Sequence, residues 1–180
     1  MKRLTIAVLL VFVVALSGLL AQEMPKPGPE HKRLGYFIGT WNVEADMKPS
    51  PFGPAGKFTA TDRVEWLAGG FFAVLHSEMT TPMGPMFGLA VFSYNAEEKV
   101  YRYHAFNSMG MFEDSRGTVS GGTWNWTSEG KVGAKLIKSR FTLKEVSPTS
   151  YTYYWATEDG NKWTTIMEGK ATKAKGSMGK

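Results

Sequence analysis

Cysteine is absent from all 180 residues of the chain. This absence excludes disulfide bonds, thiol catalysis, cysteine-based zinc sites and the lipidated cysteine of a bacterial lipoprotein. If the protein is exported into an oxidising compartment, it must therefore be stable without covalent cross-links.

A strong charge imbalance and the common catalytic motifs are also missing. The 21 Lys and Arg residues are offset by 16 Asp and Glu, and the basic residues are scattered singly except in the C-terminal tail. No basic stripe predicts nucleic-acid binding. The sequence has no Gly-x-Ser-x-Gly elbow, no Walker loop and no HExxH motif. No catalytic residue is predicted, and the absences favour a binding module over an enzyme.

An almost unbroken apolar run covers residues 6–16, directly after Lys2 and Arg3, and small residues follow it up to Ala21. This order is typical of a secretory signal peptide, predicted here as residues 1–21 with cleavage after Ala21. The run is shorter than the roughly 20 residues that a spanning helix needs. We therefore expect a periplasmic or secreted protein without stable membrane insertion; retention as an uncleaved anchor is the alternative.

Three further segments follow the predicted signal. Residues 22–33 contain several prolines and predict an extended linker. Residues 34–171 have the size of one domain with a single core. Residues 172–180 are predicted to be a disordered basic tail.

The middle of the chain alternates between apolar and polar residues, starting at Trp41 and continuing through Val43, Ala45 and Met47. Such alternation is the period of a half-buried strand. About ten such segments follow one another with turn residues between them and no room for crossover helices. We therefore predict an all-β fold: a single antiparallel up-and-down barrel of about ten strands, with a short helical plug at residues 30–38. Closure into a barrel would remove the two exposed edges of an open sheet.

In such a meander, successive loops alternate between the two ends of the barrel. The connections at 48–56, 80–85, 107–111, 128–133 and 159–161 should lie at the end away from the plug. These loops carry methionines and Phe52, whereas the loops at the plug end are compact and polar. Apolar side chains on exposed loops suggest a ligand portal or a contact surface.

Four segments carry a resemblance to known proteins: Leu34 to Trp41, Leu67 to Phe72, Phe92 to Asn95, and Phe106 to Gly110. The Gly-Thr-Trp that opens the first strand resembles the calycin pattern of lipocalins and fatty-acid-binding proteins. The whole set resembles a bacterial family of uncharacterised proteins, a domain of unknown function, and implies a calycin-like barrel. The chain departs from fatty-acid-binding proteins in its last strand, which lacks their Arg-x-Tyr.

The predicted partner is a small, largely apolar molecule held inside the barrel. Its predicted contacts, in the interior and at the rim, are Trp41, Met79, Met83, Met86, Arg102, His104, Met109, Met111 and Arg116. The two arginines are included because an inward-facing guanidinium could meet an anionic group; an outward orientation is the other interpretation.

Three alternatives to this ligand stay open at this stage. His76 and His104 are candidate haem or metal ligands, although no two histidines have the spacing that places both on one metal. Methionine thioethers could hold Cu(I). The high aromatic content could also fill the interior completely, which would make the protein a packed structural barrel.

Overall fold

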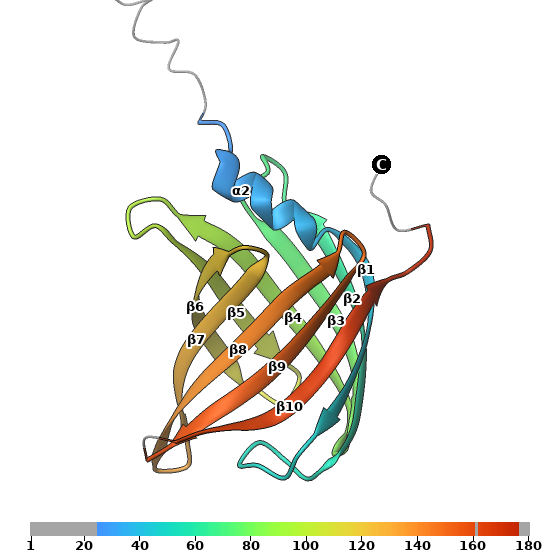
Figure 1. Ribbon diagram of the computed structural model, residues 1–180, viewed down its shortest axis with the longest axis vertical. Helices are drawn as coiled ribbons and strands as arrows, with labels where there is room; N and C mark the ends of the chain where they lie inside the picture. The colour runs from blue at the N-terminus through green and yellow to red at the C-terminus, as the bar shows by residue number, and fades with distance from the viewer. Residues whose placement is uncertain (1–24, 161, 177–180) are drawn as a thin grey trace, which may run out of the picture.

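Ten strands form one meander in the computed structural model, which describes residues 25–160 and 162–176 (Figure 1). A short helix α2 (Pro29–Arg33) and a 3₁₀ turn η1 (Leu34–Tyr36) precede the strands. The strands are β1 (Gly39–Met47), β2 (Gly56–Trp66), β3 (Ala73–Thr81), β4 (Gly84–Asn95), β5 (Val100–Asn107), β6 (Phe112–Ser120), β7 (Thr123–Val132), β8 (Lys135–Ser147), β9 (Ser150–Asp159) and β10 (Lys162–Lys173). The predicted signal peptide lies outside the described residues.

Each strand pairs antiparallel with its neighbours in sequence, and β1 pairs with β10 to close the barrel. The closing register runs from Trp41 opposite Lys173 to Met47 opposite Met167. The predicted fold class is thereby confirmed.

Strand β1 shows why the sequence adopts this register. Its apolar side chains Trp41, Val43, Ala45 and Met47 are buried, and the polar residues between them are exposed. Successive side chains on a strand point to opposite faces, so the apolar set faces the lumen. Residues directly opposite one another on neighbouring strands have side chains on the same face of the sheet. The register therefore identifies the inward-facing residues of each further strand, starting from β1.

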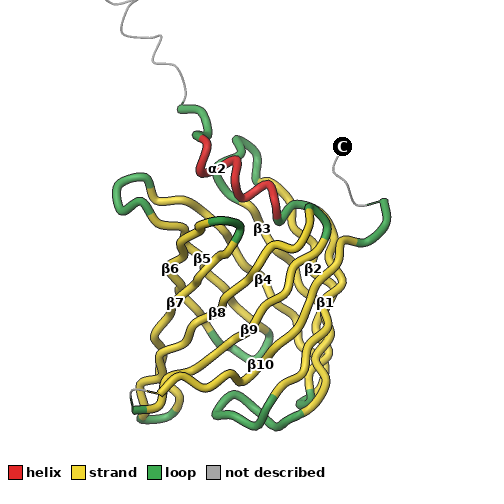
Figure 2. The backbone as a smooth tube through the Cα atoms, viewed as in Figure 1, coloured by secondary structure: helices red, strands yellow, loops and turns green. Residues whose placement is uncertain are grey.

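The helical segment closes one end of the barrel, where α2 and η1 lie across the strand ends (Figure 2). The Phe37 ring stacks on Phe92 at 5.2 Å and packs on Trp124 at 4.9 Å. The Trp41 indole N–H donates to the Phe37 carbonyl at 2.7 Å, and the Tyr36 hydroxyl donates to the carbonyls of the β8–β9 turn. The sequence-based prediction of a plug is confirmed.

Several element boundaries differ from those expected. The helix begins at Pro29, inside the predicted linker, and β10 continues to Lys173, inside the predicted tail. Residues 128–132, expected as a loop, continue β7 because they pair with β8 down to Val132 opposite Lys135. No helix among residues 25–160 and 162–176 is long and apolar enough to cross a membrane.

Candidate ligand-binding site

The half of the lumen beneath the plug is filled by side chains. Trp41 and Trp124 are at most 1% exposed, and the ring of Trp126 lies directly over Gly117. A Cβ atom at position 117 would come within 2.4 Å of that ring, so only glycine fits beneath it. Aromatic rings of η1, β1, β4, β5, β7 and β9 pack against one another here at centroid distances of about 5 to 6 Å. Little space remains for a ligand at this end.

The half away from the plug is different, because many inward-facing side chains retain solvent-accessible surface. Register places these side chains on the lumen face, opposite one another across the strands: Met79, Met86, Tyr103, Ala105, Glu113, Ser128, Ser139, Phe141 and Trp155. The β1 and β10 side of this half stays buried around Met47 and Met167. Since the side chains point inward, their accessible surface faces the lumen or its mouth. This half is therefore filled less completely than the half beneath the plug, and we call it the open half and take it as the candidate site.

A carboxyl group, Asp62, projects into the lumen near the boundary of the two halves. Asp62 on β2 lies opposite Trp41 on one side and Ser77 on the other, both of which face inward. The Ser77 hydroxyl donates a hydrogen bond to the carboxylate at 2.5 Å. Burial raises the pKa of Asp62 to about 6, and the Ser77 hydrogen bond opposes this rise.

Three tyrosines surround the same space. Tyr103 comes from β5, and Tyr151 and Tyr153 come from β9, from walls other than the one that carries Asp62. Burial raises the pKa of each hydroxyl, and the negative charge of Asp62 raises all three further. Register places these three tyrosines on the lumen face, as it does Asp62.

A second inward-facing carboxyl, Glu113, lies near the mouth. In the pairing of β6 with β7, residues Ser115–Ser120 lie opposite Thr123–Ser128. The hydrogen-bonded pairing of the two strands therefore ends before it reaches Glu113. The carboxylate accepts a hydrogen bond from the Ser115 hydroxyl at 2.5 Å. Burial among the neighbouring strands raises its pKa, while hydrogen bonds from Ser115 and Ser128 lower it. Its side chain is nevertheless solvent-accessible, because it lies where the wall between β6 and β7 opens.

Arg102, His104 and Arg116, which are among the predicted ligand contacts, lie on the outer face, so of the two orientations left open for the arginines the structure has the outward one. Tyr101, Tyr103 and Ala105 occupy the inward phase of β5, so Arg102 and His104 face outward. Arg116 pairs opposite Arg102 and faces outward for the same reason. On this outer face Arg102 and Arg116 bond to Glu98 at 2.5 and 3.1 Å, and His104 lies 3.5 Å from Asp114.

The histidines do not meet in the lumen. His76 on β3 is exposed and pairs opposite the outward-facing Leu89, and His31 lies in α2, where its ring edge packs on Phe71 and Tyr94. Among the described residues, no group of three His, Asp or Glu side chains is placed to hold a metal ion. The candidate haem or metal ligands His76 and His104 therefore lie on the outer face of the barrel.

The methionines divide between the lumen and the rim. Met79 and Met86 pair with each other and face inward, whereas Met83, Met109 and Met111 are about half exposed. The loops of Met83 and Met109 lie at the same end, as predicted, and the Ser108 N–H bonds to the Phe87 carbonyl at 2.8 Å. The three exposed methionines lie close in sequence and register to outward-facing apolar side chains of β4, β5 and β6: Phe87, Leu89, Phe106 and Phe112.

The mouth is partly covered by the β1–β2 loop. Its Phe52 ring packs on the inward-facing Trp155 at 4.7 Å, and its Gly53 lies beside the Met83 side chain. The loop thus connects the rim to the open half of the lumen.

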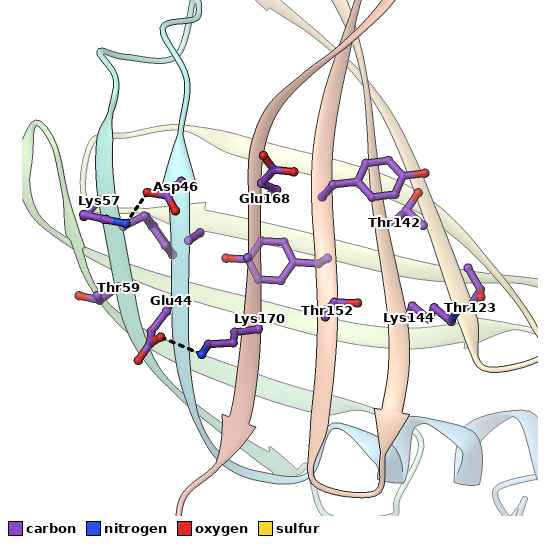
Figure 3. A pocket seen from close by; sticks show the side chains of 15 residues that line it. Glu44, Asp46, Lys57, Thr59, Thr123, Thr142, Lys144, Thr152, Glu168 and Lys170 are labelled. Atoms are coloured by element: carbon purple, nitrogen blue, oxygen red, sulfur yellow. Dashed lines mark ion pairs between the residues drawn. The ribbon is translucent and has the colours of Figure 1, made fainter.

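A hollow of about 910 Å³ lies on the outer face, over β1, β2 and β7 to β10 (Figure 3). Its charged groups pair with each other across the strands: Lys57 lies 2.7 Å from Asp46, and Lys170 lies 3.5 Å from Glu44. These pairs are well exposed, and such surface pairs are ordinary solvated contacts. The outer hollow is therefore a weaker candidate than the lumen.

The fold defines the chain as a closed ten-stranded antiparallel barrel. Residues 26–173 match the family model described as "Protein of unknown function (DUF1579)", and the chain belongs to this family. No curated protein matches the sequence.

Two solved structures resemble the chain. The crystal structure of Rv2717c from M. tuberculosis has 10% sequence identity and a TM-score of 0.58, with 82% of this chain and 99% of that chain covered. A de novo designed fluorescence-activating β-barrel has 15% identity and a TM-score of 0.44, with 78% and 95% covered. At this identity the likeness to Rv2717c concerns the fold alone.

Of the residues predicted for the site, Trp41 lies in the packed half and Met79 and Met86 line the open half. Sequence reasoning did not select Asp62, Glu113 or the tyrosines. Asp62 could have been found from the sequence. It is spaced by two residues from Ala60 and Val64, so its side chain shares the inward face of β2 with them and with Phe58. A carboxylate in the apolar phase of a strand is a candidate site residue.

Proposed function

We propose that the protein is an exported binding protein that holds a small, largely apolar ligand in the half of the barrel away from the plug. The observation that carries this proposal is the contrast in burial within one lumen. Beneath the plug the inward-facing rings of Trp41, Trp124 and Trp126 are buried, whereas Phe141 and Trp155 on the way to the mouth keep accessible surface. A concave, mostly apolar space with a few polar groups is the usual form of a small-molecule site.

The entry route in this proposal passes the methionine-bearing loops. Met83 and Met109 are 47% and 54% exposed, and the Phe52 loop lies between the rim and Trp155. Thioether side chains are flexible and adapt to ligands of different shapes. Charge at these positions should hinder the passage of an apolar molecule.

The test uses N-phenyl-1-naphthylamine, an uncharged apolar probe that becomes fluorescent when it leaves water. We expect the unmodified protein to bind it and the double variant Met83→Glu, Met109→Glu to lose binding. The same variant should melt at nearly the same temperature, because exposed positions contribute little to stability. Glu97→Lys, in the β4–β5 turn at the plug end, is the matched control and should bind normally.

Absence of probe uptake by the unmodified protein would favour a packed barrel without ligand. Normal uptake by the double variant would remove the rim from the entry route. Export itself is tested separately, by N-terminal sequencing of the protein recovered from a periplasmic extract of the host, where we expect a new terminus after Ala21.

A further inference from the structure

We infer that the ligand is an organic cation, with an apolar body in the open half of the lumen and a protonated amine against the Asp62 carboxylate. The inference rests on the proposed function and names the chemical class of its ligand. It is carried by the charges and the hydrogen-bonding groups that face the lumen.

Two carboxyl groups face the lumen, Asp62 and Glu113. Each accepts a hydrogen bond from a serine hydroxyl, and neither forms an ion pair within residues 25–160 and 162–176. Glu113 is exposed to solvent, whereas Asp62 is largely buried. A carboxylate removed from water is costly unless a cation or several hydrogen bonds compensate it. A cationic ligand would supply that compensation at Asp62.

Three tyrosine hydroxyls are available on the same lumen. The side chains of Tyr151 and Tyr153 are 9% and 6% exposed and face the lumen, and Tyr103 faces it from β5. Within the described part of the chain these hydroxyls have no hydrogen-bond partner in the protein, and their oxygen atoms are not fully buried. They can therefore accept hydrogen bonds from a donor bound in the lumen.

An aromatic wall borders the same space. Phe141 stacks on Tyr153 at 5.0 Å, and Tyr103 packs on Phe92 at 4.9 Å. Aromatic faces attract cations, more strongly when the cation is removed from water. The same wall that would hold the apolar body of the ligand thus also favours a positive charge.

Two cations lie at the plug end of the lumen. Arg33 forms an ion pair with Glu145 and lies over the Trp124 ring at 5.2 Å. Lys173 lies over the Trp41 ring at 4.9 Å. At the mouth, Lys135 lies in the inward phase of β8, opposite Val132. An anionic ligand placed against Asp62 would meet a carboxylate that forms no ion pair among the described residues, so fatty acids and other anions should bind less tightly than a cation there.

The experiment compares three molecules that share one naphthalene ring: 1-naphthylmethylamine, 1-naphthylmethanol and 1-naphthoate. Their binding to the full chain is measured by calorimetry near neutral pH. Because hydrogen bonds to charged groups are about twice as strong as neutral ones, we expect the amine to bind at least about tenfold more tightly than the alcohol. We expect the carboxylate to bind less tightly than the amine.

Variants then locate the amine. Asp62→Asn should remove the preference for the amine while leaving the affinity for the alcohol within about twofold, and Glu113→Gln should reduce the preference by a smaller factor. Asp114→Asn is the matched control, because Asp114 is the next residue in β6 but faces outward, 3.7 Å from Arg102. It should bind all three molecules as the unmodified protein does.

The outcomes separate the two proposals. If none of the three molecules binds, the proposed function itself fails. If the alcohol or the carboxylate binds as tightly as the amine, the lumen takes a ligand but the inferred class is wrong. A preference for the amine that persists in Asp62→Asn would overturn the assignment to Asp62. The comparison on the unmodified protein is decisive even if a variant does not fold.

Discussion

The two halves of this barrel are built from the same ten strands but differ in what fills them. Beneath the plug, tryptophan, tyrosine and phenylalanine rings pack against one another, and the polar groups are paired, as in the contacts of Glu145 with Arg33 and with the Trp124 indole N–H. Toward the mouth, the inward-facing set also contains smaller and polar residues, and the carboxyl groups of Asp62 and Glu113 bond to serine hydroxyls without an ion pair among the described residues. The comparison suggests that one half provides stability and the other is free to bind.

The largest expected effect comes from the packed half. Trp124→Ala removes a fully buried ring that packs on Trp126, Tyr101 and Phe37. Truncation of a large core side chain costs about 3 to 5 kcal/mol. Phe141→Ala, in the open half, should cost about 1 to 2 kcal/mol because part of its surface already faces solvent. Urea unfolding of both variants measures the difference, and equal losses would contradict the division of the barrel.

The plug contact should have the next largest effect. Glu145→Ala leaves the Arg33 guanidinium and the Trp124 N–H without their acceptor, which should cost about 1 to 3 kcal/mol. Glu168→Ala is the control, because its pair with Lys48 at 3.5 Å is exposed and should contribute less than about 1 kcal/mol. Denaturant midpoints of the two variants are compared with that of the unmodified protein. A loss as small as that of the control would show that the plug is not held by Glu145.

A third effect, similar in size to that of the plug contact, is a dependence of stability on pH that originates in the open half. The pKa of Asp62 is raised from 3.8 to about 6, so between these values the folded state binds more protons than the unfolded state. The contribution of Asp62 to stability therefore falls as pH rises through this window. Asp62→Asn should remove this decline and stabilise the protein above pH 6 by about 1 to 3 kcal/mol.

The measurement for Asp62 is urea unfolding of both proteins below pH 4 and above pH 7. Glu113 and the three tyrosines are present in both proteins, so the difference between the curves isolates Asp62. A decline that is unchanged in Asp62→Asn would assign the pH dependence to other groups.

Much of the fold could be predicted from the sequence because alternation in strands such as β1 is strict. The plug could also be predicted, since Leu34, Phe37 and Ile38 have helical spacing just before the Gly-Thr-Trp. The end of β7 could not be predicted from the sequence, because residues 128–132 include Gly130 and charged residues. This segment is a strand only because it pairs with β8. Long-range pairing is not visible in local periodicity.

The candidate site was harder to predict than the fold. The placement of Met83 and Met109 at one end followed from counting loops. The outward orientation of Arg102 and His104 could have been assigned from the phase of Tyr101, Tyr103 and Ala105 in the same strand. Asp62 and the tyrosines of β5 and β9 share one lumen only because the barrel closes, which places residues far apart in sequence on the same inner face.

The central claim is that a small molecule enters the half of the lumen away from the plug, and the methionines report on it directly. Carbon-13 labelling of their methyl groups would give separate signals for Met79 and Met86 inside and for Met109 and Met111 on the rim. On titration with N-phenyl-1-naphthylamine, we expect the signals of Met79 and Met86 to shift in a saturable way. Shifts confined to Met109 and Met111 would show that the probe binds only to the outer apolar surface, and they would contradict the claim.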